Sequence, residues 1–145
     1  TEKEVLVIPA TAITEGFAGM VAYDPREGLE VNGPRMLEAL ERIKTGAVTV
    51  AVRDSSHKGL KIRKGDHIGL YSGDIVAASG SARETSRLLL ERMLENGDEL
   101  ACVISGAEAR DEDERDIVAF LEEKGLEVEL IRGGQPVYEY IFGVE

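Results

Sequence analysis

The stretch "ELACVISGAEARDEDERDIVAFLEEKGLEVELIR", residues 99–132, decides the predicted fold. It begins with an apolar run typical of a buried strand, continues through a helix expected over about 109–124, and ends in a second strand, "EVELIR". Two strands joined by one helix in this length pair in parallel, through a right-handed crossover. The segment therefore predicts an α/β fold whose sheet is at least partly parallel.

Further elements are expected on the N-terminal side of this segment. The apolar run "EVLVI" at residues 4–8 predicts a strand covered on both faces. One helix is expected over about 34–45, where Pro34 suits the first helical position, and another from Ser81, which starts a capping-box pattern. The alternating run "AVTVAVR" at 47–53 predicts a strand between these two helices.

Two β-rich stretches complete the predicted architecture. Residues 60–79 contain short apolar runs, and Gly73-Asp74 among them is typical of a two-residue hairpin turn with glycine first. The run "VYEYIFGV" at 137–144 predicts the last strand. The predicted fold is α/β: a mixed, partly parallel sheet with flanking helices, a small antiparallel β insertion and an antiparallel C-terminal edge strand.

Length and charge limit the organisation and the partners of the chain. Its 145 residues suit one α/β domain over 1–145, with the β-rich insertion at about 60–79. The first residue is Thr1 and a strand-like run follows almost at once, so we expect a fragment of a longer protein. The net charge of -11 repels a phosphate backbone and an anionic membrane, so neither nucleic acid nor a membrane is an expected partner.

The cysteine and histidine residues predict neither a disulfide nor a metal site. Cys102 is alone and sits in an apolar run, so a buried, inert thiol is expected. His57 and His67 have no cysteine or HExxH-like partner nearby. Because no secretory signal is evident and the apolar runs fall far short of the roughly 20 residues that span a bilayer, we expect a cytoplasmic protein.

Two loops are candidates for contacting a partner. In "GGQPVYEY" a strand follows the glycines, whereas phosphate cradles lead into a helix, so the stretch is interpreted as a turn or a partner-contacting loop. The aromatic residues of the strand that follows are expected to fill core rather than an interface. A second polar loop, "RDSSH", leaves the end of a predicted strand. The candidate partner-binding residues are Arg53, Asp54, Gly133, Gly134, Gln135, Pro136 and Tyr138.

Four segments in collinear order carry a resemblance to a known family. They are "VIPATAITEGFAGMVAYDP", "IKTGAVTVAVRD", "IRKGDHIGLYSGDIVA" and "GGQPVYEYIFGVE". Together they resemble the C-terminal region of the A-subunit family of bacterial fatty-acid kinases, whose members have often been labelled dihydroxyacetone-kinase-like. The likeness covers nearly the whole chain.

This resemblance implies a docking role without catalysis. In that family an N-terminal domain holds ATP and magnesium, and the C-terminal region docks a DegV-type fatty-acid-binding protein whose acyl carboxylate is phosphorylated. The resemblance therefore implies no catalytic residue, no metal and no cofactor in this chain. It also implies no nucleic-acid partner and no integral membrane contact, while homo-oligomer formation stays open.

Two other functions stay open at this point. One is a dihydroxyacetone-kinase-like catalytic or substrate-binding domain that uses a glycine loop and a histidine. The residues do not favour it, because phosphoryl transfer needs a triphosphate cradle, metal-holding side chains and a charge stabiliser, and no such set is evident in the sequence. The other is a small-molecule sensor whose ligand binds at the carboxyl edge of the sheet.

Overall fold

The computed structural model describes residues 3–145. Its internal contacts divide the chain into two compact units, one ending at Ile43 and one spanning Lys44–Glu145. Each unit is described by itself below. One α/β domain over the whole chain stays a prediction, because a division by contacts does not test whether the units fold independently.

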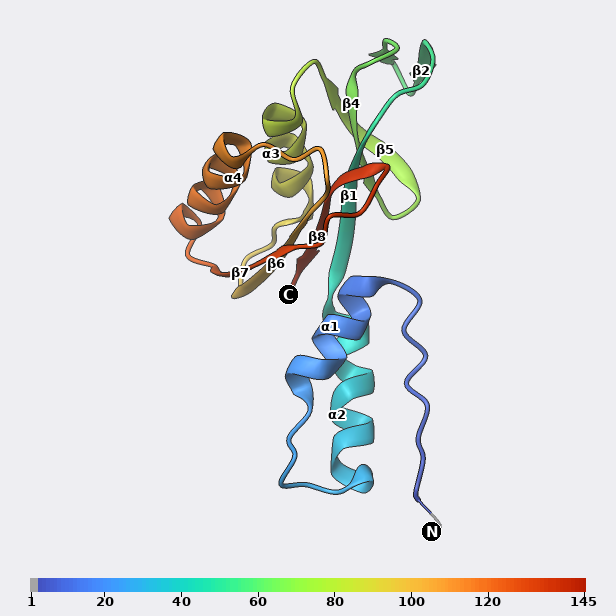
Figure 1. The fold of residues 1–145 in the computed structure, drawn as a ribbon, viewed down its shortest axis with the longest axis vertical. Coiled ribbons are helices and arrows are strands. Elements are labelled where there is room, and N and C mark those ends of the chain that lie inside the picture. Colours follow the sequence, from blue (N-terminus) through green and yellow to red (C-terminus); the bar gives the residue numbers. More distant parts are fainter. Residues whose placement is uncertain (1–2) are drawn as a thin grey trace. The chain divides into compact units, whose positions relative to one another are not determined.

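The N-terminal unit is a pair of packed helices, α1 (Ile13–Ala22) and α2 (Leu29–Arg42) (Figure 1). The side chain of Asn32, which is buried, organises the connection between them. Its amide nitrogen donates to the carbonyl oxygens of Asp24 and Glu27, both at 2.9 Å, and its Oδ1 accepts from the Asp24 amide. One polar side chain thus satisfies three backbone groups and fixes where α2 begins.

Helix α2 starts earlier than predicted, and Pro34 lies inside it rather than at its first position. The Gly28 carbonyl accepts from the amides of Val31 and Asn32, so the first turn forms ahead of the proline. The missing proline amide would have bonded the carbonyl of Glu30, which is still near the start of the helix. The prediction of a helix over 34–45 was therefore wrong at both ends.

The prediction of a strand at residues 4–8 was also wrong. Within residues 3–145 this run has no sheet partner, and the Val5 and Val7 side chains are exposed. Leu6 alone packs closely, against Gly33 of α2. A short apolar run shows that a segment prefers burial, but not whether a neighbouring strand is available to pair with it.

The C-terminal unit contains a six-stranded mixed sheet (Figure 1). Strands β6 and β7 pair in parallel, and every other neighbouring pair is antiparallel. This confirms the predicted α/β class and the parallel crossover through a helix. The strand order is β5 (Asp74–Ser79), β4 (His67–Tyr71), β1 (Lys44–Val50), β8 (Tyr138–Val144), β6 (Leu100–Ser105) and β7 (Glu127–Arg132).

The last strand lies inside the sheet and not at its edge. Strand β8 is antiparallel, as predicted, but it pairs with β1 on one side and β6 on the other, so that Tyr140 lies opposite both Val48 and Ser105. The Tyr140 and Phe142 side chains are fully buried, and their rings stack with centroids 5.7 Å apart. Two buried aromatic rings fill the centre of a sheet better than its margin.

Helices α3 (Ala82–Met93) and α4 (Asp111–Glu123) cover one face of this sheet (Figure 1). Ser81 caps α3 as predicted, because its side chain accepts from the Glu84 amide at 3.3 Å. Glycines in the sheet let α3 come close: a Cβ on Gly69 would lie 3.2 Å from the Leu89 Cβ. The core between helices and sheet is built from Val48, Leu89, Leu90, Met93, Val103, Ile117, Leu121, Tyr140 and Phe142, among others.

The β-rich region between β1 and α3 is divided between two sheets. Strand β1 ends at Val50, earlier than predicted, and the chain then forms a separate hairpin of β2 (Ser55–His57) and β3 (Leu60–Ile62). Strands β4 and β5 belong to the main sheet instead. Their turn is Ser72-Gly73, not Gly73-Asp74, because both turn residues have positive φ, at 52° and 75°.

Candidate functional site

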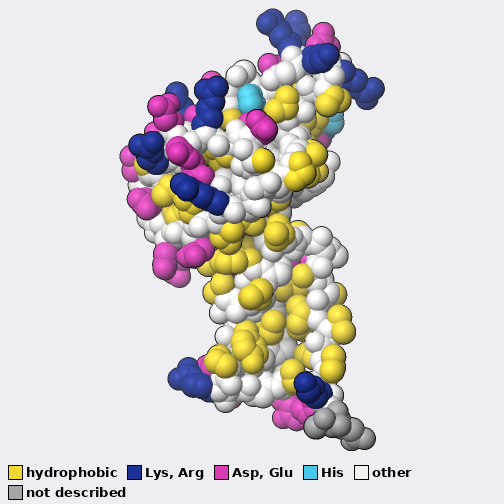
Figure 2. Space-filling model, viewed as in Figure 1, with side chains coloured by type: hydrophobic (Ala, Val, Ile, Leu, Met, Phe, Trp, Pro, Cys, Tyr) yellow, Lys and Arg dark blue, Asp and Glu magenta, His cyan; other side chains and the backbone are white. Residues whose placement is uncertain are grey.

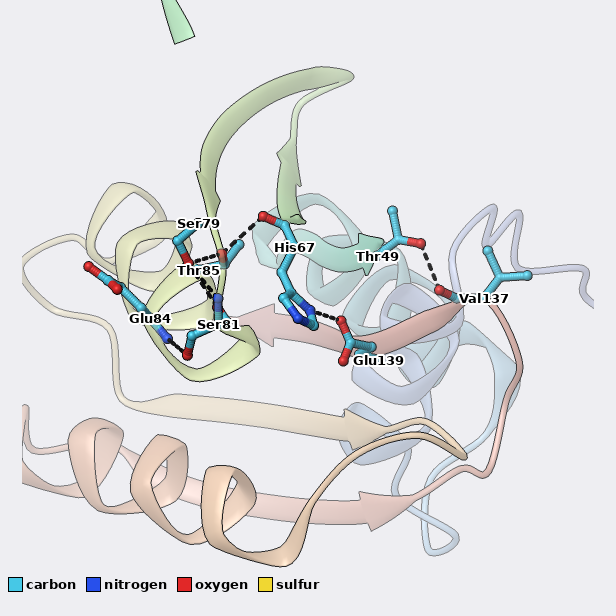
Figure 3. Close-up of polar contacts among 8 residues, drawn as sticks. All are labelled: Thr49, His67, Ser79, Ser81, Glu84, Thr85, Val137 and Glu139. Carbon is cyan, nitrogen blue, oxygen red and sulfur yellow. Dashed lines mark hydrogen bonds and ion pairs between the residues drawn. The ribbon is translucent and has the colours of Figure 1, made fainter. Parts of the chain in front are cut away.

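The structure brings the predicted partner loop to the end of the sheet where β1, β6 and β7 finish. The Thr49 hydroxyl, next to the end of β1, donates to the Val137 carbonyl at 2.7 Å (Figure 3). Arg53 and Asp54 follow the end of the same strand. The two candidate segments, distant in sequence, therefore meet the same end of the sheet.

Backbone hydrogen bonds hold the loop 133–137 against the end of β6. The amides of Gly133 and Gly134 both donate to the Ser105 carbonyl, at 2.9 and 3.0 Å. The Gln135 side-chain amide donates to the carbonyl of Ile104 at 3.3 Å, and the Gln135 carbonyl accepts from Ala107 at 3.0 Å. The Gln135 side chain thus supports the loop itself, which has the geometry of a turn. Its contact with a partner stays a prediction.

Val137 gives this loop an exposed apolar tip. Its φ is 72°, a region that a β-branched residue rarely adopts, and its side chain is 73% exposed. Exposed or partly exposed side chains of Val50 and Tyr138 lie beside it, since Tyr138 pairs with Thr49 across the sheet. We name Val50, Val137 and Tyr138 the apolar patch.

A cleft of about 720 Å³ opens beside this patch, between the first turns of α3 and α4. Val50 and Val137 line it together with basic and acidic side chains. Its size suits a small ligand or a partner's side chain. The polar lining includes His67, Ser81, Arg83, Glu112, Asp113 and Glu139.

An imidazole–carboxylate pair lies on the wall of the cleft. His67 Nδ1 contacts Glu139 Oε1, and the Glu139 side chain is largely buried (Figure 3). A β-bulge makes this contact: Val48 pairs with Tyr140 and Thr49 pairs with Tyr138, so that Glu139 is the extra residue. Sequence reasoning missed the pair, although a glutamate between two tyrosines of an apolar strand was a usable signal.

Hydroxyl groups connect His67 to the start of α3. The buried Thr85 hydroxyl donates to the His67 carbonyl at 3.0 Å and lies 2.7 Å from Ser79 Oγ (Figure 3). Ser79 Oγ accepts from the Ser81 amide and donates to the Ser81 carbonyl. The first turn of α3 is therefore fixed relative to β4 and β5.

Tyr140 also lines the cleft. Its hydroxyl is buried and has no hydrogen-bond partner among residues 3–145. Burial raises the pKa of this phenol, and the charges of Asp113, Glu114 and Glu139 raise it further. The hydroxyl therefore stays neutral at physiological pH, in a negative local field.

The β2–β3 hairpin is tied to β5 by a second carboxylate. Asp74 Oδ2 pairs with Lys58 Nζ at 2.6 Å, and Asp74 Oδ1 contacts His57 Nε2. The Lys58 hydrogen bond, and next the His57 one, lower the pKa of Asp74 to about 2. Asp54 is used within the hairpin, since its Oδ1 accepts from the Lys64 amide at 2.7 Å.

Cys102 is buried in β6, as predicted. Desolvation raises the pKa of its thiol to about 11, and Glu129 on β7 adds to this shift. In the described part of the chain no cluster of three or more His, Cys, Asp or Glu residues could hold a metal ion. No helix within residues 3–145 is long and apolar enough to cross a membrane.

Comparisons with known proteins agree over the whole chain. A family model for the C-terminal part of FakA-like proteins, which resemble the A-subunit of fatty acid kinase, matches residues 1–145. An uncharacterized protein of Staphylococcus haemolyticus is 40% identical over 146 residues, which are 99% of this chain and 26% of that protein. Protein YloV of Bacillus subtilis is 36% identical over the same length, with the same coverage. The chain thus spans about a quarter of the relatives it matches.

Proposed function

The chain belongs to the FakA-like C-terminal family of fatty acid kinases, and we propose that it is a noncatalytic docking module. In this proposal it binds a DegV-type fatty-acid-binding protein in the cytoplasm. That partner presents the acyl carboxylate, and a separate ATP-binding part of the kinase phosphorylates it. ATP and magnesium belong to that other part, consistent with relatives about four times as long as this chain.

The observation that carries the proposal is the rigid loop with an exposed apolar tip. Loop 133–137 is held by hydrogen bonds to Ser105, Ile104 and Ala107, while Val137 remains 73% exposed in a strained conformation. Backbone strain at an exposed position points to a functional constraint. A pre-organised loop loses little conformational entropy when it meets a partner. An exposed valine next to Tyr138 offers apolar area without needing a ligand cavity.

Calorimetric titration of the chain tests the docking function. We expect heat on adding a fatty-acid-loaded DegV-type protein and none on adding Mg-ATP. Val137→Asp should weaken the binding of the partner about tenfold, since loss of a central apolar contact costs more than about 1 kcal/mol and Asp tolerates positive φ. Val5→Asp, at an equally exposed valine of the other unit, is the matched control and should bind as the parent does.

The reverse result would favour the other functions. Heat with Mg-ATP and none with the protein would support the catalytic or substrate-binding domain. Equal weakening by Val137→Asp and Val5→Asp would show that the loop is not the contact.

A further inference from the structure

Positive charge is concentrated in one short segment of this acidic chain. Residues 52–64, which we name the basic arm, contain five basic residues and one acidic residue, a net charge of +4. The whole chain carries -11, so the remaining residues carry -15. Figure 2 shows dark blue side chains gathered at the end of the C-terminal unit where Figure 1 places β2. The basic residues are Arg53, Lys58, Lys61, Arg63 and Lys64.

The acidic residues near the arm are occupied by other contacts. The Asp54 carboxylate accepts from the Lys64 amide, and Asp66 Oδ2 accepts from the Arg63 amide at 2.9 Å. Asp74 is paired with Lys58. These carboxylates bind backbone groups or anchor the hairpin instead of neutralising the ends of the arm's side chains.

Four basic side chains of the arm consequently have no ion-pair partner among residues 3–145, and all four are exposed. They are Arg53, Lys61, Arg63 and Lys64. Unpaired like charges repel one another, so a chain that only had to fold would gain from distributing them among its acidic residues. Their concentration indicates a negatively charged partner.

The arm is held in place and does not need to order on binding. The side chain of Ile62 is buried, and Lys58 is fixed by Asp74. At its base the Ala51 amide donates to the Asp66 carbonyl at 2.8 Å, and the Gly65 amide donates to the Ala51 carbonyl at 2.9 Å. A fixed array of cations retains more of its electrostatic attraction as binding free energy than a mobile tail does.

We propose that the basic arm binds an acidic surface of a protein partner. This inference rests on the proposed function, so the acidic surface belongs to the docked fatty-acid-binding protein. Val52 at the base of the arm is 83% exposed and follows Val50 of the apolar patch by two residues. Apolar contact beside an array of charges is the composition of a protein interface, with its apolar centre and polar rim.

An anionic membrane fits the arm less well than a protein does. Strands of three residues extend only about 10 Å, close to the Debye length of about 8 Å at physiological ionic strength. A negative plane touching the arm would therefore also meet the field of the other residues, which carry -15. A protein can confine its negative charge to the area that the arm covers.

A charge-reversal experiment on the 145-residue chain tests the arm. The variant Lys61→Glu, Arg63→Glu, Lys64→Glu changes side chains that make no ion pair among residues 3–145. The control variant Lys3→Glu, Arg35→Glu, Arg92→Glu makes the same change in net charge at exposed positions elsewhere. Association with an immobilised, fatty-acid-loaded DegV-type protein is measured at about 50 and about 500 mM NaCl, on either side of physiological ionic strength. Thermal melts check that each variant is folded.

We expect the arm variant to bind at least about tenfold more weakly than the parent at low salt, mainly through slower association. At high salt the difference should shrink to about threefold or less, because screening removes the attraction. The control variant should stay within about threefold of the parent at both salt concentrations, since scattered charges do not face the acidic surface.

Other outcomes separate this inference from the proposed function. If the parent binds and the arm variant binds equally well, the inference is overturned and the docking function stands. If the parent does not bind the protein at all, both are overturned. If the parent binds vesicles of anionic phospholipid through the arm, and its binding of the protein does not depend on the arm, the membrane replaces the acidic protein surface.

Discussion

At the scale of single residues, buried or paired charges explain the local geometry. Glu139 turns out of the apolar pattern of β8 through a bulge and contacts His67. Asp74 anchors the basic arm through Lys58 and His57. Both carboxylates join segments that are distant in sequence, and neither contact follows from local patterning.

Asp74 gives a prediction about pH. Its pKa is lowered from the ordinary 3.8 to about 2, so the anchoring of the arm is complete above about pH 4 and is lost as the pH falls toward 2. Asp74→Asn should therefore be less stable than the parent at about pH 6, and the difference should vanish near pH 2. Denaturant unfolding across this pH range measures both.

The pKa of Asp74 can be followed directly by NMR of its carboxyl carbon. Lys58→Ala should raise it, because the Lys58 hydrogen bond is its largest cause. Lys61→Ala on the same hairpin makes no contact with Asp74 and should leave the pKa near 2. An unchanged pKa in Lys58→Ala would contradict the anchoring role.

At the scale of elements, the position of β8 determines what the chain tolerates. Phe142 is fully buried in this central strand, so Phe142→Ala should lower the free energy of unfolding by about 3–5 kcal/mol. Tyr138→Ala, on the same strand but 39% exposed, should cost less than about 1.5 kcal/mol. Urea unfolding of the two variants measures the difference, and equal small losses would mean that β8 is not central.

The sequence predicted the strand–helix–strand segment and the cap of α3 well, because these depend on contacts within one stretch of chain. Periodicity also indicated the existence of β8. Its place between β1 and β6 could not be predicted, because strand order depends on which edges remain free. The same reason explains the error at residues 4–8, where an apolar run found no partner strand.

For the candidate site, the sequence indicated both segments but not their meeting. The glycines of "GGQPV" marked a turn, and the structure adds the hydrogen bonds that hold it against Ser105. The cleft, the His67–Glu139 pair and the buried Tyr140 hydroxyl required the register of β8 to be known. The basic arm was visible as composition alone, yet its significance depends on which carboxylates are already occupied.

At the scale of the whole molecule, the hydrophobic core belongs to one unit. Every residue of the core cluster lies between Val48 and Val144. We therefore expect a chain cut to residues 44–145 to fold alone, with a cooperative thermal transition and the near-ultraviolet circular dichroism of the parent. A non-cooperative melt of this shortened chain would show instead that residues before 44 are needed, as one domain over 1–145 requires.

The docking surface proposed here is one end of the sheet, with the basic arm and loop 133–137. Hydrogen–deuterium exchange of the chain with and without the fatty-acid-loaded DegV-type protein tests this most directly. We predict slower amide exchange at residues 52–64 and 133–138 in the complex, with α2 unchanged. Protection confined to other elements, or no protection anywhere in the chain, would contradict the proposed surface.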